Sequence, residues 1–406
     1  MKNPMNKSLY RVVFSCIVAL LSFGGYAQNN TYHSVLGENT WHRLSVTKEG
    51  IYKLDYATLE RMGIDMSALD PNQIRLFGNP SGVLPEKNAV SRPDDLTEMA
   101  ISVVGAEDGV FDRGDVVYFY GQEPTRWKLT GNSNNNYQRE RNPYSDTTYY
   151  YLCTDSGTDG LRVGEKATLP VEGTTTVISE FPDFVWHEEE LFSPYNLGQN
   201  WFGESLSLED TVLSLQLLMP NLVKDKMLRV KSRVYGRVKG QSMRYDIMLN
   251  DTYVVNNSAI ASYGSNYYAK ESSYEGMTLS ESDTLTVTIR LKDSPSASLY
   301  LDFVEIYGWR QLRRVGDVFS FRLMPSQFGN DASAVWIQDA NAQCQLWEVT
   351  APLRPVVQEC VVSGGNMVFA LDERVEKRYV LFNPLAAMEV EHVQAIANQN
   401  VHAIAG

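Results

Sequence analysis

Alternation of apolar and polar residues is the dominant pattern of this chain. Apolar residues share one parity in residues 228–234, 243–249 and 285–291. A period of two is typical of β-strands with one buried and one solvated face. Turn-forming residues such as Asn250 and Asp251 separate these stretches. The pattern therefore predicts a mainly β protein.

Signals for helices are few, and the best one lies in residues 55–63. Asp55 can cap the first turn, Leu59 and Met62 lie on one face, and Gly63 can end the helix. We therefore expect one short helix in the N-terminal part of the chain, which would make that part α+β in type.

The chain has 406 residues, which is too long for one ordinary hydrophobic core and predicts several domains. Residues 28–170 predict an N-terminal β-rich (α+β) domain. Longer, evenly spaced strands in residues 171–310 predict a central jelly-roll-like β-sandwich. Residues 311–384 predict a small C-terminal β domain, whose expected core residues are Phe319, Phe321, Val335, Trp336, Ile337, Leu346, Trp347 and Val349.

Two segments have few large apolar side chains. Residues 385–406 are rich in alanine and offer little apolar area against the cost of ordering the backbone, about 1–2 kcal/mol per residue. We expect them to be a poorly anchored linker. Residues 131–136 contain a glycine, a serine and four asparagines, and they predict a mobile polar loop.

Residues 1–27 have the three parts of a cleavable signal peptide. Lys2, Lys7 and Arg11 form a basic region, residues 12–23 are apolar, and small residues precede Gln28. The apolar run is shorter than the roughly 20 residues that span a bilayer. We therefore expect export, to the periplasm or the outer-membrane cell surface, and no membrane-spanning segment.

The charge of the chain limits its partners. The formal net charge is −13 at pH 7. A chain this acidic repels the phosphates of nucleic acids and the surface of anionic membranes. Both are therefore excluded as expected partners.

No arrangement in the sequence points to nucleophilic catalysis, which needs a Cys or Ser beside a base. None of the five histidines lies in a nucleophile motif or near a cysteine in the sequence: His33, His42, His187, His392 and His402. Cys153 and Cys360 lie in strand-like sequence, as buried core cysteines do. We assign no catalytic or cofactor-binding residue. A hydrolase with an unrecognised site remains an alternative, and Cys344 and Cys360 could be a disulfide or two free thiols.

Two acidic strings are candidates for metal binding. Asp108, Asp112 and Asp115 are weak calcium candidates, because hard cations bind several carboxylates on a glycine-rich turn. The same string is also typical of Asx turns before a strand, and we favour that interpretation. The run from His187 to Glu190 lacks a second histidine four residues away, so a solvated surface run is the favoured interpretation.

Aromatic residues are abundant, with 23 Tyr, 15 Phe and 7 Trp. A jelly-roll sandwich can present such side chains to sugars, although in strands they more often pack in the core. A surface carbohydrate-binding β-sandwich protein is therefore the alternative function.

Several strings, taken in order, resemble one protein family. They are WHRLSV (41–46), GIYKL (50–54), IRLFGN (74–79), DGVFDRGD (108–115), NPYSD (142–146), YYYL (149–152), NWFGE (200–204), DFVEI (302–306) and WEVT (347–350). Together they resemble the N-terminal region of the PorU-like sortases of the type IX secretion system. The likeness is collinear from about residue 36 to the end.

The resemblance implies a function for relatives of full length. PorU-like sortases carry a gingipain-like cysteine peptidase domain after their N-terminal β region. They remove C-terminal sorting domains from secreted cargo and attach the cargo to the cell surface. Residues 398–402 resemble the lead-in to that domain, and no residue here matches the family's catalytic His or Cys. The resemblance therefore implies a non-catalytic region for scaffolding, or for binding the outer-membrane β-barrel of the secretion system or its cargo.

Overall fold

The computed structural model describes residues 33–130, 137–194, 201–264, 268–292, 296–391 and 393–403. These residues form mainly β-strands, which confirms the predicted fold class. The expected signal peptide (1–27) and polar loop (131–136) lie outside the described residues. Residues Thr40–Ile396 form one compact unit, and a second unit contains the chain up to Asn39 and from Ala397.

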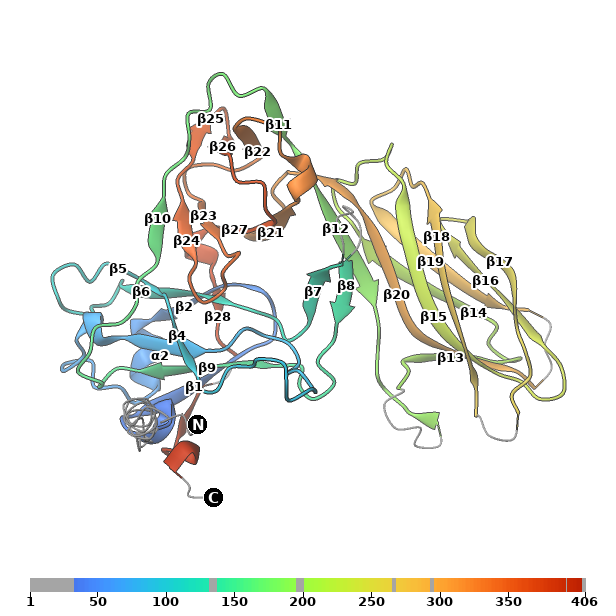
Figure 1. Ribbon diagram of the computed structural model, residues 1–406, viewed down its shortest axis with the longest axis horizontal. Coiled ribbons are helices and arrows are strands. Elements are labelled where there is room, and N and C mark those ends of the chain that lie inside the picture. Colours follow the sequence, from blue (N-terminus) through green and yellow to red (C-terminus); the bar gives the residue numbers. More distant parts are fainter. Residues whose placement is uncertain are drawn as a thin grey trace, which may run out of the picture. The chain divides into compact units, whose positions relative to one another are not determined.

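The N-terminal domain contains two sheets with a shared core (Figure 1). One sheet has the order β29 (Val393–Ile396), β1 (Trp41–Val46), β9 (Thr148–Cys153), β3 (Arg75–Gly78) and β4 (Thr97–Met99). The other has the order β28 (Met388–Glu389), β2 (Gly50–Asp55), β6 (Val116–Gly121) and β5 (Ser102–Val104). Four pairs of consecutive strands place one member in each sheet (β1 and β2, β2 and β3, β4 and β5, β28 and β29), so the chain closes both sheets around one core.

The predicted helix is confirmed as α2 (Tyr56–Arg61). The carboxylate of Asp55 accepts a hydrogen bond from the backbone N–H of Thr58 at 2.8 Å, as an N-cap does. Leu59 is fully buried, and Gly63 has a φ of 85°, which a glycine adopts without strain. Further helical segments among the described residues of Thr40–Ile396 are the short 3-10 turns η2 (Pro71–Gln73), η4 (Pro325–Gln327) and η5 (Pro384–Ala386).

The expected linker after Pro384 is instead anchored in the N-terminal domain as far as Ile396. β28 pairs parallel with β2, and β29 pairs antiparallel with β1. Val390 packs into the core of this domain, and Ala387 is buried too. Main-chain pairing with two preformed strands compensates for the small side chains, which the apolar content of the segment does not reveal.

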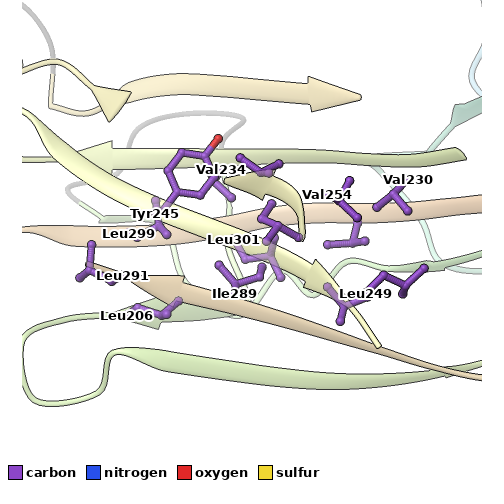
Figure 2. Close-up of a cluster of buried hydrophobic side chains, with 14 of the residues drawn as sticks. Leu206, Val230, Val234, Tyr245, Leu249, Val254, Ile289, Leu291, Leu299 and Leu301 are labelled. Carbon is purple, nitrogen blue, oxygen red and sulfur yellow. The ribbon is translucent and has the colours of Figure 1, made fainter. Parts of the chain in front are cut away.

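The central domain is a β-sandwich of two sheets. One sheet has the order β12 (Glu180–His187), β20 (Ser298–Gln311), β15 (Leu228–Arg237) and β18 (Lys270–Thr278), with β13 (Glu204–Leu206) also on β20. The other has the order β14 (Val212–Leu218), β19 (Thr284–Leu291), β16 (Met243–Leu249) and β17 (Thr252–Ile260). Along β15 every second residue is buried, as the alternation predicts. Figure 2 shows inward side chains of this core, such as Val230, Tyr245 and Ile289.

The small C-terminal domain also contains two sheets. One sheet has the order β10 (Gly164–Lys166), β24 (Val356–Gln358), β23 (Gln345–Glu348), β27 (Lys377–Phe382) and β21 (Val318–Leu323). The other has the order β11 (Thr176–Ile178), β22 (Ser333–Ile337), β26 (Asn366–Leu371) and β25 (Val361–Ser363). β10 and β11 pair parallel with β24 and β22, so residues near the expected boundary at 170 belong to this domain.

The expectation that Trp336 lies in the core of the small domain is wrong. Trp336 is 39% exposed, because it lies between Val335 and Ile337, which both point into the core. Since successive residues of a strand face opposite sides, the tryptophan lies on the outer face.

A partly buried network of charges ties β10 to the rest of the small domain. Lys166 lies 2.8 Å from both Glu348 and Glu373, and Lys377 lies 2.9 Å from Glu348 and pairs with Glu373. The side chains of Glu348 and Lys377 are only 10% and 7% exposed. Burial raises the pKa of Glu348, but the hydrogen bonds from the two lysines outweigh it and hold that pKa below its usual value.

The second unit joins the two ends of the described chain. It contains the 3-10 turns η1 (Val35–Gly37) and η6 (Val401–Ala403). Ser34 N–H donates to the side chain of Asn400 at 3.1 Å, and Gln399 N–H donates to the carbonyl of Leu36 at 2.8 Å. Residues 397–403 therefore have ordered partners, contrary to the expected loose linker.

Candidate functional site at the hairpin junction

A hairpin of the N-terminal domain contacts the other two domains of Thr40–Ile396. Its strands are β7 (Arg126–Leu129) and β8 (Tyr137–Glu140), which pair with each other in a separate sheet (Figure 1). At its base Arg126 donates twice to Glu140, at 3.1 and 2.8 Å, and Lys128 donates to the same carboxylate. The register of the hairpin is thereby tied where it leaves the domain.

Aromatic packing attaches the hairpin to the sandwich. Trp127 is 2% exposed and stacks on Phe184 of β12, with 3.4 Å between ring centroids. The edges of Trp186 and Tyr307 complete its environment, at 5.2 and 6.2 Å. Aromatic pairs stabilise by about 0.5–1.5 kcal/mol beyond the burial of their area. Trp127 is therefore the anchor of this interface.

Ion pairs add a second layer to the same interface. Arg139 of β8 pairs with Glu188 and lies 3.8 Å from Glu305 of β20, and all three side chains are at most 7% exposed. Tyr307 donates to Glu305 at 2.6 Å. Arg141 pairs with Glu190. Buried carboxylates and guanidinium groups are tolerated together because each compensates for the other's loss of water.

The acidic run from His187 to Glu190 is thus not a solvated surface run, as the sequence favoured. His187 lies 2.5 Å from Glu204, while Glu188 and Glu190 pair with the arginines of the hairpin segment. Glu188 and Glu190 therefore dock the hairpin segment, and their arginine partners are about fifty residues away in the sequence.

The hairpin also contacts the small domain. Arg378 of β27 donates to the carbonyl of Trp127 at 3.0 Å, and the hydroxyl of Tyr137 lies 2.7 Å from the sulfur of Met324. Arg322 of β21 covers the rings of Tyr137 and Phe184 at 5.4 and 5.1 Å. The hairpin junction, as we call this region around Trp127 and Tyr137, therefore joins all three domains.

A cavity of about 170 Å³ lies at the hairpin junction. Glu49 and Glu123 come from the N-terminal domain, Phe184 and Trp186 from the sandwich, and Arg322 and Arg378 from the small domain. Burial raises the pKa of Glu123 to about 7, and the neighbouring Glu49 adds to this, while Arg322 and Arg139 oppose it. The cavity therefore holds a carboxyl group that titrates near neutral pH.

The calcium candidates make local hydrogen bonds instead of converging on one point. Asp115 accepts from the N–H of Asp112 at 2.6 Å, and Asp108 accepts from the N–H of Val110 at 3.0 Å. The bond of Asp108 is that of an Asx turn, the interpretation that the sequence favoured, whereas the carboxylate of Asp115 reaches back to the start of the turn. Across the described ranges no group of three His, Cys, Asp or Glu side chains is placed to hold a metal ion.

The three cysteines in the described ranges, Cys153, Cys344 and Cys360, are free thiols. Cys344 and Cys360 pack against the same core cluster, and Cys153 is 1% exposed in β9. Burial raises the pKa of Cys153 to about 11 and that of Cys360 to about 12. Thiols with such pKa values are almost entirely protonated at pH 7 and are poor nucleophiles.

The histidines have partners other than cysteine. His42 contacts the carbonyl of Met62 at 3.0 Å, and His33 contacts Asn400 at 3.1 Å. His392 lies outside the described residues. The hydrogen bonds of Cys153 and Cys360 go to Asp155 and to the carbonyl of Gln358.

One group of aromatic side chains on the sandwich packs on itself, while Trp201, Tyr253 and Tyr274 are exposed. Phe202 stacks on Tyr300 at 5.3 Å and contacts Tyr235 at 5.2 Å, and Phe202 and Tyr300 are at most 8% exposed. This is the packing role that the sequence weighed against a sugar site.

Sequence reasoning did not single out the hairpin junction. Trp127, Phe184 and Glu123 occur in no recognisable motif, and each interacts with residues far away in the sequence. The sequence did contain one indirect signal, the acidic run from His187 to Glu190, but nothing in the sequence indicated which residues it pairs with.

The fold and the junction define a three-domain β protein in which one hairpin of the N-terminal domain contacts both the β-sandwich and the small β domain. Among solved structures, the chain is similar to dimeric latent PorU from Porphyromonas gingivalis, with a TM-score of 0.74 and 20% identity. The match covers 93% of this chain and 35% of that one. The chain therefore has the fold of the corresponding part of PorU and spans about a third of its length.

Other structural similarities are partial. A calcium- and xylotriose-bound CBM36 carbohydrate-binding module matches 32% of this chain and 99% of its own, at 12% identity and a TM-score of 0.21. A family 35 module from Clostridium thermocellum matches 32% and 98%, at 11% identity and a TM-score of 0.20. Scores this low carry no functional argument. No family model and no curated protein matches the chain.

Proposed function

We propose that this chain is the non-catalytic N-terminal region of a PorU-like sortase of the type IX secretion system. Its role is to act as a scaffold and to bind the outer-membrane β-barrel of that system or its secreted cargo. The observation that carries the proposal is the similarity to PorU through all three domains, at a TM-score of 0.74. The collinear strings of the sequence support it independently.

The chemistry of the described residues supports a binding role over a catalytic one. Cys153 would be a thiolate in only about one molecule in ten thousand at pH 7, given a pKa of about 11. The contacts of the hairpin junction hold the domains together. A scaffold needs such a junction, because partner surfaces on different domains must keep a fixed spacing.

The proposed location is the periplasm or the outer-membrane cell surface, reached through the predicted signal peptide. In the described part of the chain no helix is both long and apolar enough to cross a bilayer.

Binding and cleavage are measured together. Purified protein starting at Gln28 is incubated with secreted cargo that carries its C-terminal sorting domain, and with matched cargo lacking that domain. In parallel it is tested on nanodiscs that hold the type IX β-barrel or an unrelated porin. We expect binding to the specific barrel or cargo without cleavage. The proposal is contradicted if the protein binds neither the barrel nor the cargo. It is also contradicted by thiol-dependent cleavage that is lost in Cys153→Ala.

A further inference from the structure

Glu123 lies at the point where the hairpin leaves the N-terminal domain. β6 ends at Gly121 and β7 begins at Arg126, so Glu123 belongs to the short segment that sets the direction of the hairpin. On one side its side chain lines the 170 Å³ cavity of the junction. On the other it lines a more open hollow of about 490 Å³, together with Thr47 and Arg141.

Residues from every neighbouring element face this carboxyl group. Most of the charged side chains among them already have a partner. The two acids do: Glu49 accepts from Tyr120 at 3.0 Å, and Asp183 pairs with Arg310 at 2.6 Å. Three arginines do as well: Arg378 lies 3.5 Å from Glu376, Arg139 pairs with Glu188, and Arg141 pairs with Glu190. Arg322 lies over aromatic rings, and Asp146 lines the outer hollow. The arginines near Glu123 therefore already have carboxylate or aromatic partners.

An ionised Glu123 is poorly accommodated in this setting. It would lie in a small cavity with aromatic walls and with a second carboxylate, Glu49, on the same lining. Two carboxylates that share a site resist simultaneous ionisation. When the hairpin swings away from the cavity, Glu123 regains water and its ionised form is no longer disfavoured.

We propose that Glu123 is a proton-controlled latch, which closes the hairpin on the other two domains when it is neutral and loosens it when it is ionised. The proposal concerns this chain's own domains and does not rest on the proposed function. Its direction follows from linkage: a carboxyl with a raised pKa in the closed state stabilises that state at low pH. This stabilisation is lost as the pH rises from the ordinary value of 4.5 to about 7.

The size of the effect follows from the same two values. With a pKa of about 7 in the closed state and 4.5 in the open state, the opening constant of the hairpin rises about tenfold between pH 6 and pH 8. Above pH 8 the carboxyl is ionised in both states and the constant levels off.

The test is hydrogen exchange of the hairpin amides, residues 126–129 and 137–140, in the full chain at pH 6 and pH 8. Rates are corrected for the intrinsic pH dependence of exchange. We expect the tenfold rise in the wild type, and less than a twofold change in Glu123→Gln, which mimics the neutral acid. The matched control is Glu86→Gln, at an exposed glutamate of the same domain, which should behave as the wild type does.

A second variant separates titration from a structural role of the side chain. Glu49→Gln removes the neighbouring like charge, so the midpoint of opening should move to lower pH while Glu123 stays in place. A wild-type opening constant that does not change with pH overturns the proposal. So does a full pH response in Glu123→Gln, or an unmoved midpoint in Glu49→Gln.

Discussion

Replacing Trp127 by alanine should detach the hairpin from the sandwich and the small domain. The side chain is 2% exposed and contacts Phe184, Trp186 and Tyr307. A buried aromatic side chain removes about 150–250 Å² from water, and at about 25 cal/mol per Å² this amounts to about 4–6 kcal/mol. Measured losses for Trp→Ala in cores are about 3–5 kcal/mol, which agrees.

Replacing Trp127 by phenylalanine should lower the stability less than replacing it by alanine. Within the described residues the indole N–H of Trp127 is buried without an acceptor, so phenylalanine removes an unsatisfied donor and keeps most of the ring packing. We expect a loss of less than about 2 kcal/mol for this variant, because it shortens the side chain without emptying the site.

The assay is urea unfolding of the full chain, combined with hydrogen exchange at the hairpin. Trp336→Ala is the matched control, since this tryptophan is 39% exposed and should cost no more than about 1 kcal/mol. If Trp127→Ala costs no more than Trp336→Ala, and the hairpin amides stay protected, Trp127 does not anchor the junction and the reasoning is refuted.

Two further predictions concern charged groups. Because the pKa of Glu348 is lowered in the folded state, its network stabilises the protein above about pH 4.5 and is lost as the pH falls below it. Removing its charge in Glu348→Ala strands the buried Lys377 with only Glu373 and should cost about 3–5 kcal/mol at pH 7, with a weaker acid dependence of the melting temperature. A cost below about 1 kcal/mol contradicts a structural role for the network. Asp55→Ala removes the cap of α2 and should cost about 1 kcal/mol in urea unfolding, whereas Asp55→Asn should largely retain it; equal losses in both variants would count against the capping role.

The sequence alone determined the features that depend on neighbouring residues. The period of two in residues 228–234 predicted β15 and its buried face, because a strand alternates its side chains whatever its partner is. The N-cap at Asp55 was predicted for a similar reason, since capping involves atoms within three residues. Trp336 shows the limit of counting apolar residues: its parity, which places it opposite Val335 and Ile337, was the better guide.

The tertiary structure decided which segments meet. Strands β28 and β29 are held in place because two strands from the start of the chain pair with them, and because Met388, Val390 and Val393 pack against the core of the N-terminal domain. The run from His187 to Glu190 looked solvated, yet Glu188 is buried and Glu190 is partly buried because Arg139 and Arg141 reach them from another domain. Glu123 titrates near neutral pH only because three domains close around it. Burial and the field of distant charges depend on the whole fold, so no local pattern in the sequence encodes them.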